Sequence, residues 1–359
     1  LRVVSNSSLK NGARSLNDCL PKGPNSLNSM FDLMIRFRCH ETGLVFDLTK
    51  AYNSIHTGLV EKHVRRLIWR FSPEDPWQDY AFATVAFGDR PAATFLELGK
   101  DLTLDSGQDI DPVAAYKCKK DSYLDDFITG GKKSEVVRMM GKRLGLGEYS
   151  GTICQMLKKG NLKVKIMVAT GETDQEAKDL LGNKVLGYGW DATTDDMFVK
   201  FPVNVSGRVR KLKKHPDLTP GTLHLLKDVK LTKRLCLGIT NGFLDFLGIS
   251  CPFTLRFKLL MKQIFEDSEI TAWNHEVTGA AKLAWIELIQ EAVQTGSLIF
   301  PRTTRPSDAV GACLLVSFDD GSFEAFSAVV YVRWEVSCKH ESNLEFDGDF
   351  VSQLLCAKA

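Results

Sequence analysis

The chain has 359 residues, a length that usually corresponds to two or three domains. Its composition, 44% hydrophobic and 25% charged, excludes a disordered, collagen-like or coiled-coil protein. Forty-six Lys and Arg against 44 Asp and Glu give a net charge of +2, so total charge alone does not indicate a nucleic-acid partner. Asp245, Arg256 and Lys258 interrupt the most apolar region, 235–265, and we therefore expect no membrane partner.

The cysteines and the two ends of the chain give the first expectations about context. Nine cysteines without a Cys-x-x-Cys pair favour reduced thiols in an intracellular protein over a disulfide framework or a zinc ribbon. The chain starts at Leu1 with no signal-peptide pattern, and it stops in the apolar run 354–359. Both ends favour a segment of a longer polypeptide.

The first part of the chain mixes short strands with amphipathic segments. Residues 43–47 predict a strand that ends at Asp47, and apolar residues recur at helical spacing over 59–68. A second strand is predicted over 80–87, and a helix with proline in its first turn over 91–100. Residues 105–112 predict a polar loop.

Further along, the predicted order is β, then helical, then β again. Residues 162–168 alternate apolar and basic side chains, which predicts a strand with one positive face. The densest basic run, 207–215, is typical of a solvated loop unless other evidence points to nucleic acid. The remaining predictions are a hairpin over 185–203 with its turn at 191–196, helices over 219–294, and a hairpin formed by 312–318 and 326–332.

The strongest chemical signal is Tyr-Leu-Asp-Asp at 123–126, followed by the apolar pair Phe-Ile. Adjacent carboxylates between apolar neighbours are costly to bury unless a positive charge compensates them. A divalent metal at the tip of a β-hairpin would provide that charge. Taken alone, the pattern favours a surface turn.

Asp47 provides a partner for this pair, because it ends a separate apolar strand. A carboxylate there and the pair on a neighbouring hairpin can hold two Mg²⁺ ions ~3.5–4 Å apart, the arrangement that supports in-line phosphoryl transfer. Magnesium prefers a few carboxylates together with substrate phosphates, which fits this sparse acidic set.

These residues carry a family resemblance. Phe-Asp-Leu-Thr-Lys-Ala-Tyr at 46–52 resembles motif A of reverse transcriptases, 86–91 a shortened motif B, and 123–126 motif C. Flanking segments in the same order resemble the Pol polyprotein of BEL/Pao long-terminal-repeat retrotransposons, namely 2–4, 15–18, 23–24, 186–191, 232–234, 243–258 and 300–302.

The resemblance implies an α+β fold in three parts. Residues 1–205 would form partial fingers and a reverse-transcriptase palm, an antiparallel sheet with helices, and 206–305 a mostly helical thumb and connection. Residues 311–359 would begin a truncated RNase H-like domain with Asp320 as its first catalytic carboxylate. Since later carboxylates of that domain are missing, we expect no RNase H hydrolysis from the chain.

The resemblance also assigns roles at the polymerase site. Asp47 and Asp125 would chelate two Mg²⁺ ions, with Asp126 as the supporting carboxylate and the backbone carbonyl of Leu48 facing metal. Tyr52 would exclude a ribose 2′-OH.

Further assignments concern the nucleotide and the duplex. Arg2 would contact the triphosphate, and Phe87 and Gly88 would pack on the nascent base pair. Lys163 and Lys165 are both candidates for protonating the leaving pyrophosphate. The basic run would contact nucleic-acid phosphates through Arg208, Arg210, Lys211, Lys213 and Lys214.

The function implied is that of an RNA-directed DNA polymerase, a nucleotidyltransferase. Its partners would be an RNA template–DNA primer duplex, deoxynucleoside triphosphates and the remaining Pol segments, and its location a cytoplasmic retrotransposon particle. One alternative is a catalytically dead relic, because the upstream fingers are missing and Asn6 stands where the family usually has Asp. A less favoured alternative is an aspartic peptidase that uses Asp105. Such an enzyme needs two aspartates that share a proton, and the chain has no second copy of the Asp105 motif.

Overall fold

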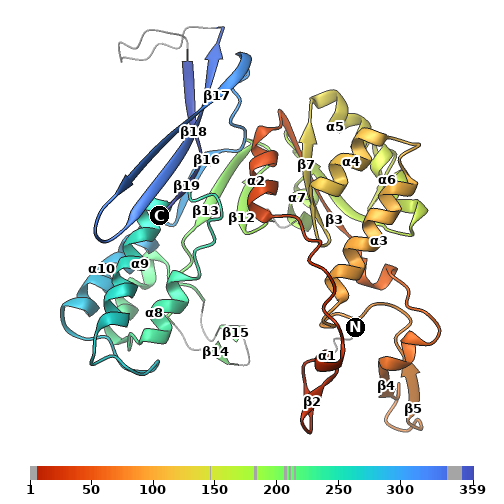
Figure 1. Cartoon of the computed structure of the whole chain (residues 1–359), viewed down its shortest axis with the longest axis horizontal. Coiled ribbons are helices and arrows are strands. Elements are labelled where there is room, and N and C mark those ends of the chain that lie inside the picture. The colour runs from red at the N-terminus through yellow and green to blue at the C-terminus, as the bar shows by residue number, and fades with distance from the viewer. Residues whose placement is uncertain are drawn as a thin grey trace. The chain divides into compact units, whose positions relative to one another are not determined.

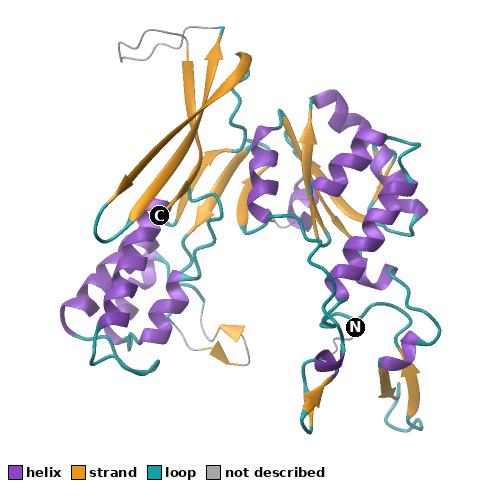
Figure 2. Cartoon of the chain, viewed as in Figure 1, coloured by secondary structure: helices purple, strands orange, loops and turns teal. Residues whose placement is uncertain are grey.

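A computed structural model describes residues 6–145, 147–181, 184–205, 208–209, 212–213, 216–337 and 350–359. The chain divides into two compact units, 1–182 and 183–359, each of which is described by itself. Both units combine helices with antiparallel sheets (Figure 2), which confirms the predicted α+β class. No helix in the described ranges has the length and apolar character needed to cross a membrane.

The first unit is built around a four-stranded antiparallel sheet in the order β10-β3-β7-β6. Figure 1 labels β3 and β7, the two central strands of the first unit. Its elements are β1 (Lys10–Asn11), β2 (Arg14–Ser15), α1 (Leu16–Cys19), α2 (Met30–Cys39), β3 (Thr42–Leu48), η1 (Ala51–Ser54), η2 (Glu61–Val64), β4 (Arg66–Trp69), β5 (Gln78–Ala81), α3 (Ala92–Ser106), α4 (Pro112–Lys120), β6 (Ser122–Tyr123), β7 (Asp126–Gly131), α5 (Lys133–Met140), β8 (Arg143–Gly145), β9 (Glu148–Tyr149), α6 (Thr152–Lys159), β10 (Val164–Ala169) and α7 (Gln175–Leu181).

The central strands β3 and β7 are apolar because helices cover them. Helices α2, α4 and α5 pack against β7, and α7 packs against β10. Phe46 of β3 and Phe127 of β7 are fully buried and stack with their ring centroids 4.4 Å apart. The expected strand 43–47 is found within β3 as a buried apolar run. The expected strand 162–168 is found as β10, but Lys163 lies outside it, so Lys165 is its one basic residue and the predicted positive face is not formed.

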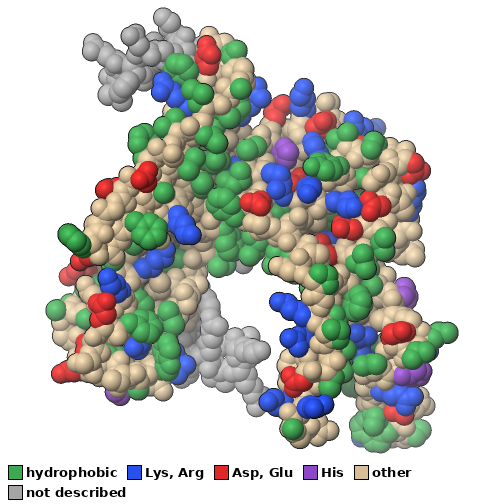
Figure 3. All heavy atoms as spheres, in the orientation of Figure 1, with side chains coloured by type: hydrophobic (Ala, Val, Ile, Leu, Met, Phe, Trp, Pro, Cys, Tyr) green, Lys and Arg blue, Asp and Glu red, His purple; other side chains and the backbone are tan. Residues whose placement is uncertain are grey.

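The segment between β3 and α3 differs from its sequence prediction. Instead of a helix over 59–68, the chain forms the short 3₁₀ helix η2 and then strand β4; the strand expected over 80–87 is only β5. The predicted helix is wrong because the apolar residues of this segment are not buried against a core. Ile68 is 63% exposed, and apolar side chains gather at the outer end of the β4–β5 hairpin (Figure 3).

The predicted loop over 105–112 is also shorter than expected. Helix α3 continues through Asp105 to Ser106, and α4 begins at Pro112. The start of α4 has a local cause, because the Asp111 carboxylate accepts the Ala114 N–H at 3.0 Å and proline occupies the first turn. Asp105 therefore lies in the last turn of a helix, where its carboxylate pairs with Lys119 at 2.9 Å.

The second unit has two antiparallel sheets and a group of helices. The sheets have the orders β11-β12-β13-β16 and β17-β18-β19. Its elements are β11 (Lys184–Val185), β12 (Tyr188–Asp191), β13 (Asp196–Lys200), β14 (Arg208–Val209), β15 (Leu212–Lys213), η3 (Pro220–Asp228), α8 (Lys233–Thr240), α9 (Cys251–Glu266), α10 (Gly279–Thr295), β16 (Ser297–Pro301), β17 (Ala309–Gly321), β18 (Phe326–Val336) and β19 (Phe350–Lys358).

Both predicted hairpins of this unit are present, as β12–β13 and β17–β18, and the predicted helical stretch contains η3, α8, α9 and α10. The β12–β13 hairpin lies within the predicted first segment, 1–205. In the structure β13 pairs with β16 over 196–200 and 297–301, so the hairpin belongs to the second unit. This pairing is long-range and leaves no local mark in the sequence.

Candidate active site

The Tyr-Leu-Asp-Asp segment forms the tight turn between β6 and β7. Tyr123 pairs with Asp126 across the hairpin, so Leu124 and Asp125 are the two central residues of the turn. Leu124 has a φ of 56°, a left-handed conformation that is unfavourable for a leucine. Such outliers persist only where surrounding contacts hold them, and they concentrate at functional sites.

The sheet brings Asp47 beside this turn. Asp47, near the end of β3, is paired with Asp126, the first residue of β7, and the Leu48 N–H donates to the Asp125 carbonyl at 3.1 Å. One carboxylate oxygen from each of Asp47, Asp125 and Asp126 lies within 4.8 Å of the others. This is the one group of three potential metal ligands found among the residues that the structure describes. The predicted acidic set is therefore brought together by the fold.

The electrostatics of the three carboxylates favour a bound cation. Burial and then the Asp125 charge raise the pKa of Asp47 above its usual value, although Lys165 opposes this. Burial, followed by the charges of Asp125 and Asp47, raises the pKa of Asp126 to about 6, even though solvent reaches part of its side chain. Three acidic groups that repel one another in this way are suited to a divalent ion, which would relieve the repulsion.

The structure distinguishes the two candidate lysines. Strand β10 has an irregular register between Val164 and Ile166 where it pairs with β3, and Lys165 lies within this irregularity. Its Nζ is 3.3 Å from an Asp47 oxygen, whereas Lys163 is exposed and has no ion pair with the three carboxylates among the described contacts. Bulges commonly redirect a side chain beside an active site, and this one directs Lys165 to the carboxylates.

Tyr52 and Phe87 form an aromatic wall next to the carboxylates. Tyr52, in η1, is 8% exposed, and its ring centroid is 4.4 Å from that of Phe87. Burial, followed by the charges of Asp125 and Glu97, raises the pKa of Tyr52 above its usual value. Gly88 follows with a φ of 93°, a backbone conformation that glycine adopts without strain.

Several side chains without a predicted role hold this segment. The Asn17 side chain donates to the Gly88 carbonyl at 2.9 Å and accepts the Arg90 N–H at 2.8 Å. Buried Asp89 accepts from the Ser7 hydroxyl at 2.6 Å and pairs with Arg65. Nothing in the local sequence marks these contacts, because each joins residues far apart in the chain.

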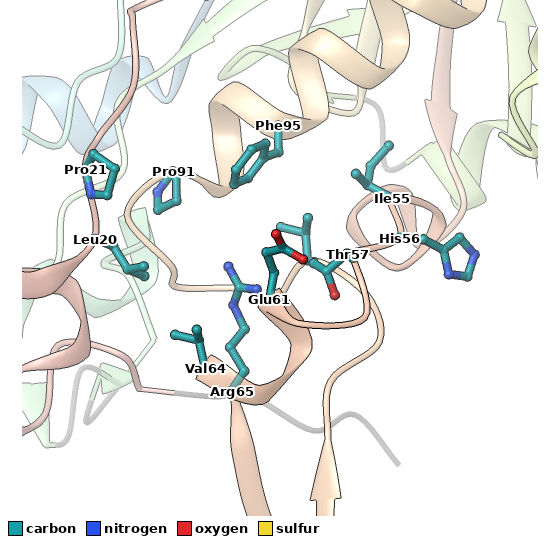
Figure 4. Close-up of a pocket in the computed structure, with 12 residues that line it drawn as sticks. Leu20, Pro21, Ile55, His56, Thr57, Glu61, Val64, Arg65, Pro91 and Phe95 are labelled. Atoms are coloured by element: carbon teal, nitrogen blue, oxygen red, sulfur yellow. The ribbon is translucent and has the colours of Figure 1, made fainter.

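The first unit has cavities of about 550, 310 and 190 Å³. The first of these is lined by Thr49, Lys163 and Lys165, the last of which contacts Asp47. The second, about 310 Å³, lies beside the start of α3; none of the three carboxylates lines either of these two cavities. Figure 4 shows Glu61 and Arg65 pointing into this second cavity and His56 pointing away from it.

The remaining predicted site residues belong to the second unit or lie outside the described residues. Asp320 is exposed near the end of β17. Arg208 and Lys213 are paired across the short β14–β15 hairpin. Arg2, Arg210, Lys211 and Lys214 lie outside the described residues.

Comparisons with known proteins identify the class of the C-terminal part. Residues 232–359 match the family of Pao retrotransposon-like RNaseH-like domains. The match begins within the segment predicted as thumb and connection and continues through the predicted RNase H-like segment. For these residues it confirms the resemblance to BEL/Pao retrotransposons.

The chain was also compared with solved structures and with curated protein sequences. The chain is similar to the solved structure of a foamy viral protease-reverse transcriptase in complex with double-stranded DNA, with 12% identity and a TM-score of 0.49. The similarity covers 95% of this chain and 48% of the viral chain, so the chain spans about half the length of that protein. No curated protein sequence matches it.

Proposed function

We propose that the first unit is the polymerase centre of a retrotransposon Pol protein, an RNA-directed DNA polymerase. The observation that carries the proposal is the convergence of Asp47, Asp125 and Asp126 beside the Tyr52–Phe87 wall. The family match of residues 232–359 supports the retrotransposon context. The reaction would be attack of a primer 3′-OH on the α-phosphate of a deoxynucleotide, directed by an RNA template.

In this proposal Asp47 and Asp125 hold two Mg²⁺ ions, with Asp126 and the Leu48 carbonyl in support. When bound, the ions supply activation of the 3′-OH and stabilisation of the leaving oxygen. The crowding that raises the pKa values of Asp47 and Asp126 supports this assignment, because it leaves negative charge for a cation to neutralise.

Other residues act on the substrates. Tyr52 lies under the sugar and excludes a 2′-OH, and Phe87 and Gly88 contact the nascent base pair. Lys165, 3.3 Å from Asp47, is favoured over Lys163 as the residue that protonates pyrophosphate. Arg2 contacts the triphosphate, and the basic residues over 208–214 bind duplex phosphates in a salt-dependent manner.

Primer extension on an RNA template with Mg²⁺ tests the proposal. Asp125→Asn should abolish extension. Asp105→Asn is the matched change at an acidic residue of α3 that pairs with Lys119 of α4, and it should leave extension intact. Wild-type chain with no extension above Asp125→Asn would contradict the proposal and favour the dead relic. Cleavage of a polyprotein substrate that is lost in Asp105→Asn would favour the peptidase instead.

A further inference from the structure

A buried ion pair on α3 contacts the turn that carries Asp125. Glu97 and Lys100 are one helical turn apart on the inner face of the helix, and they are only 3% and 0% exposed. Lys100 Nζ lies 3.0 Å from Glu97 Oε1. Removing two charges from water is costly, so a pair buried this completely is weak evidence for stability and calls for another explanation.

Both members of the pair bind the backbone of the same residue. Glu97 Oε1 accepts the Leu124 N–H at 2.9 Å, and Lys100 Nζ donates to the Leu124 carbonyl. Lys100 Nζ also lies 5.1 Å from the centre of the Phe127 ring, which follows Asp126 in β7. The pair therefore satisfies both polar backbone groups of the residue immediately before the two carboxylates.

Leu124 is also the strained residue of the turn. Its φ of 56° is a conformation that a leucine avoids unless its surroundings impose it. A donor and an acceptor fixed on a rigid helix, one for each backbone group of Leu124, define the orientation of this peptide. Because Asp125 and Asp126 follow directly, the orientation of Leu124 determines where their carboxylates point.

We propose that Glu97 and Lys100 are positioning residues that hold the Leu124 backbone in its left-handed conformation and thereby aim Asp125 and Asp126 at the metal. Neither side chain needs to touch metal or substrate. The positioning role rests on the proposed polymerase function. Metal affinity is nevertheless the primary quantity that tests it.

The test measures Mn²⁺ affinity of the 359-residue chain by electron paramagnetic resonance, without nucleic acid. Lys100→Met should weaken Mn²⁺ binding by roughly 10–100-fold, the usual effect of losing a group that orients a metal ligand. Because Lys100→Met leaves Glu97 buried and unpaired, the double variant Glu97→Gln/Lys100→Met is measured as well. It carries no orphaned charge, and it should fold and still bind Mn²⁺ weakly.

Lys117 provides a matched control in the same unit. It pairs with Glu135 at 2.9 Å and donates to the Gly130 carbonyl at 2.9 Å, so it makes the same kind of bridge at the far end of β7. Lys117→Met should leave Mn²⁺ affinity unchanged. If the double variant is folded, by circular dichroism and thermal unfolding, and binds Mn²⁺ as the wild type does, the positioning role is wrong.

Primer extension separates this inference from the proposed function. In an active chain the double variant should lower kcat by roughly the same factor and leave the nucleotide KM nearly unchanged, since the nucleotide wall is intact. An active wild type with an equally active double variant would refute the positioning role and leave the polymerase proposal standing. An inactive wild type whose Mn²⁺ affinity still depends on Lys100 would refute the polymerase proposal alone.

Discussion

The two units contain nearly the same local pattern with opposite outcomes. Residues 124–127 are Leu-Asp-Asp-Phe and residues 318–321 are Phe-Asp-Asp-Gly. In the first unit the neighbouring strand β3 places Asp47 opposite Asp126. In the second unit β18 places Ala328 and Ser327 opposite Asp319 and Asp320, and β17 is an edge strand of its sheet. An adjacent acidic pair becomes a candidate metal site only where the partner strand adds a third carboxylate.

The largest expected effect is on metal binding, which should differ between the two acidic pairs. Asp125→Asn should weaken Mn²⁺ binding by more than the roughly 10–100-fold expected for a supporting group, because it removes a direct ligand. Asp320→Asn, the matched change in the second unit, should leave Mn²⁺ affinity unchanged. Titration of free Mn²⁺ by electron paramagnetic resonance measures both. An equal loss in Asp320→Asn would show that the two acidic pairs do not differ as the structure indicates.

Lys165 beside Asp47 is a further difference between the units, since β18 places no Lys or Arg opposite Asp319 and Asp320. Lys165→Met should lower the extension rate by about 10²-fold or more, the usual contribution of a general acid, and the exposed Lys163 replaced by Met should have little effect. Single-turnover extension measures the chemical step. A larger loss in Lys163→Met would reverse the assignment made from the 3.3 Å contact.

The next largest effect is expected on sugar discrimination, through the Tyr52–Phe87 wall. Tyr52→Val should raise incorporation of ribonucleotides relative to deoxynucleotides by roughly 10–200-fold, because the steric exclusion of one hydroxyl is worth ~1–3 kcal/mol. Tyr80→Val is a matched control, because Tyr80 also contacts a phenylalanine, Phe71, but in the β4–β5 hairpin. The control should keep the wild-type ratio. Unchanged discrimination in Tyr52→Val would remove Tyr52 from the sugar site.

The smallest effect concerns pH. Because the Asp126 pKa is raised to about 6, protons should compete with Mn²⁺ below that pH, and affinity should fall on acidification from pH 7 to pH 5. Without metal, acidification should have the opposite effect on folding stability, which should rise as the pH falls. The stabilising contribution of protonated Asp126 is present below the unfolded value of about 4 and is lost as pH rises through about 6.

Thermal unfolding in a chelator measures this second effect. Asp126→Asn, which cannot ionise, should gain stability relative to wild type as pH rises from 4 to 7. The gain should be modest, because solvent that reaches Asp126 screens its charge. A difference that does not change with pH would show that Asp126 titrates normally.

Local patterns predicted much of the fold and the three carboxylates that the fold brings together. The apolar run before Asp47 predicted β3, and turn residues between β-rich runs predicted the hairpins β12–β13 and β17–β18. Periodicity failed over 59–68, where apolar side chains remain exposed in the β4–β5 region instead of covering a core.

The amino-acid sequence specifies the residue types: one acidic pair after Leu124, one aspartate at the end of a buried strand, and two lysines at 163 and 165. Their arrangement depends on tertiary contacts. Strand pairing placed Asp47 beside Asp126, Lys165 lies 3.3 Å from Asp47 within the irregular register of β10, and α3 placed Glu97 and Lys100 on the Leu124 backbone. These contacts join distant parts of the chain, and local propensity carries no information about which distant partner a strand or helix will find.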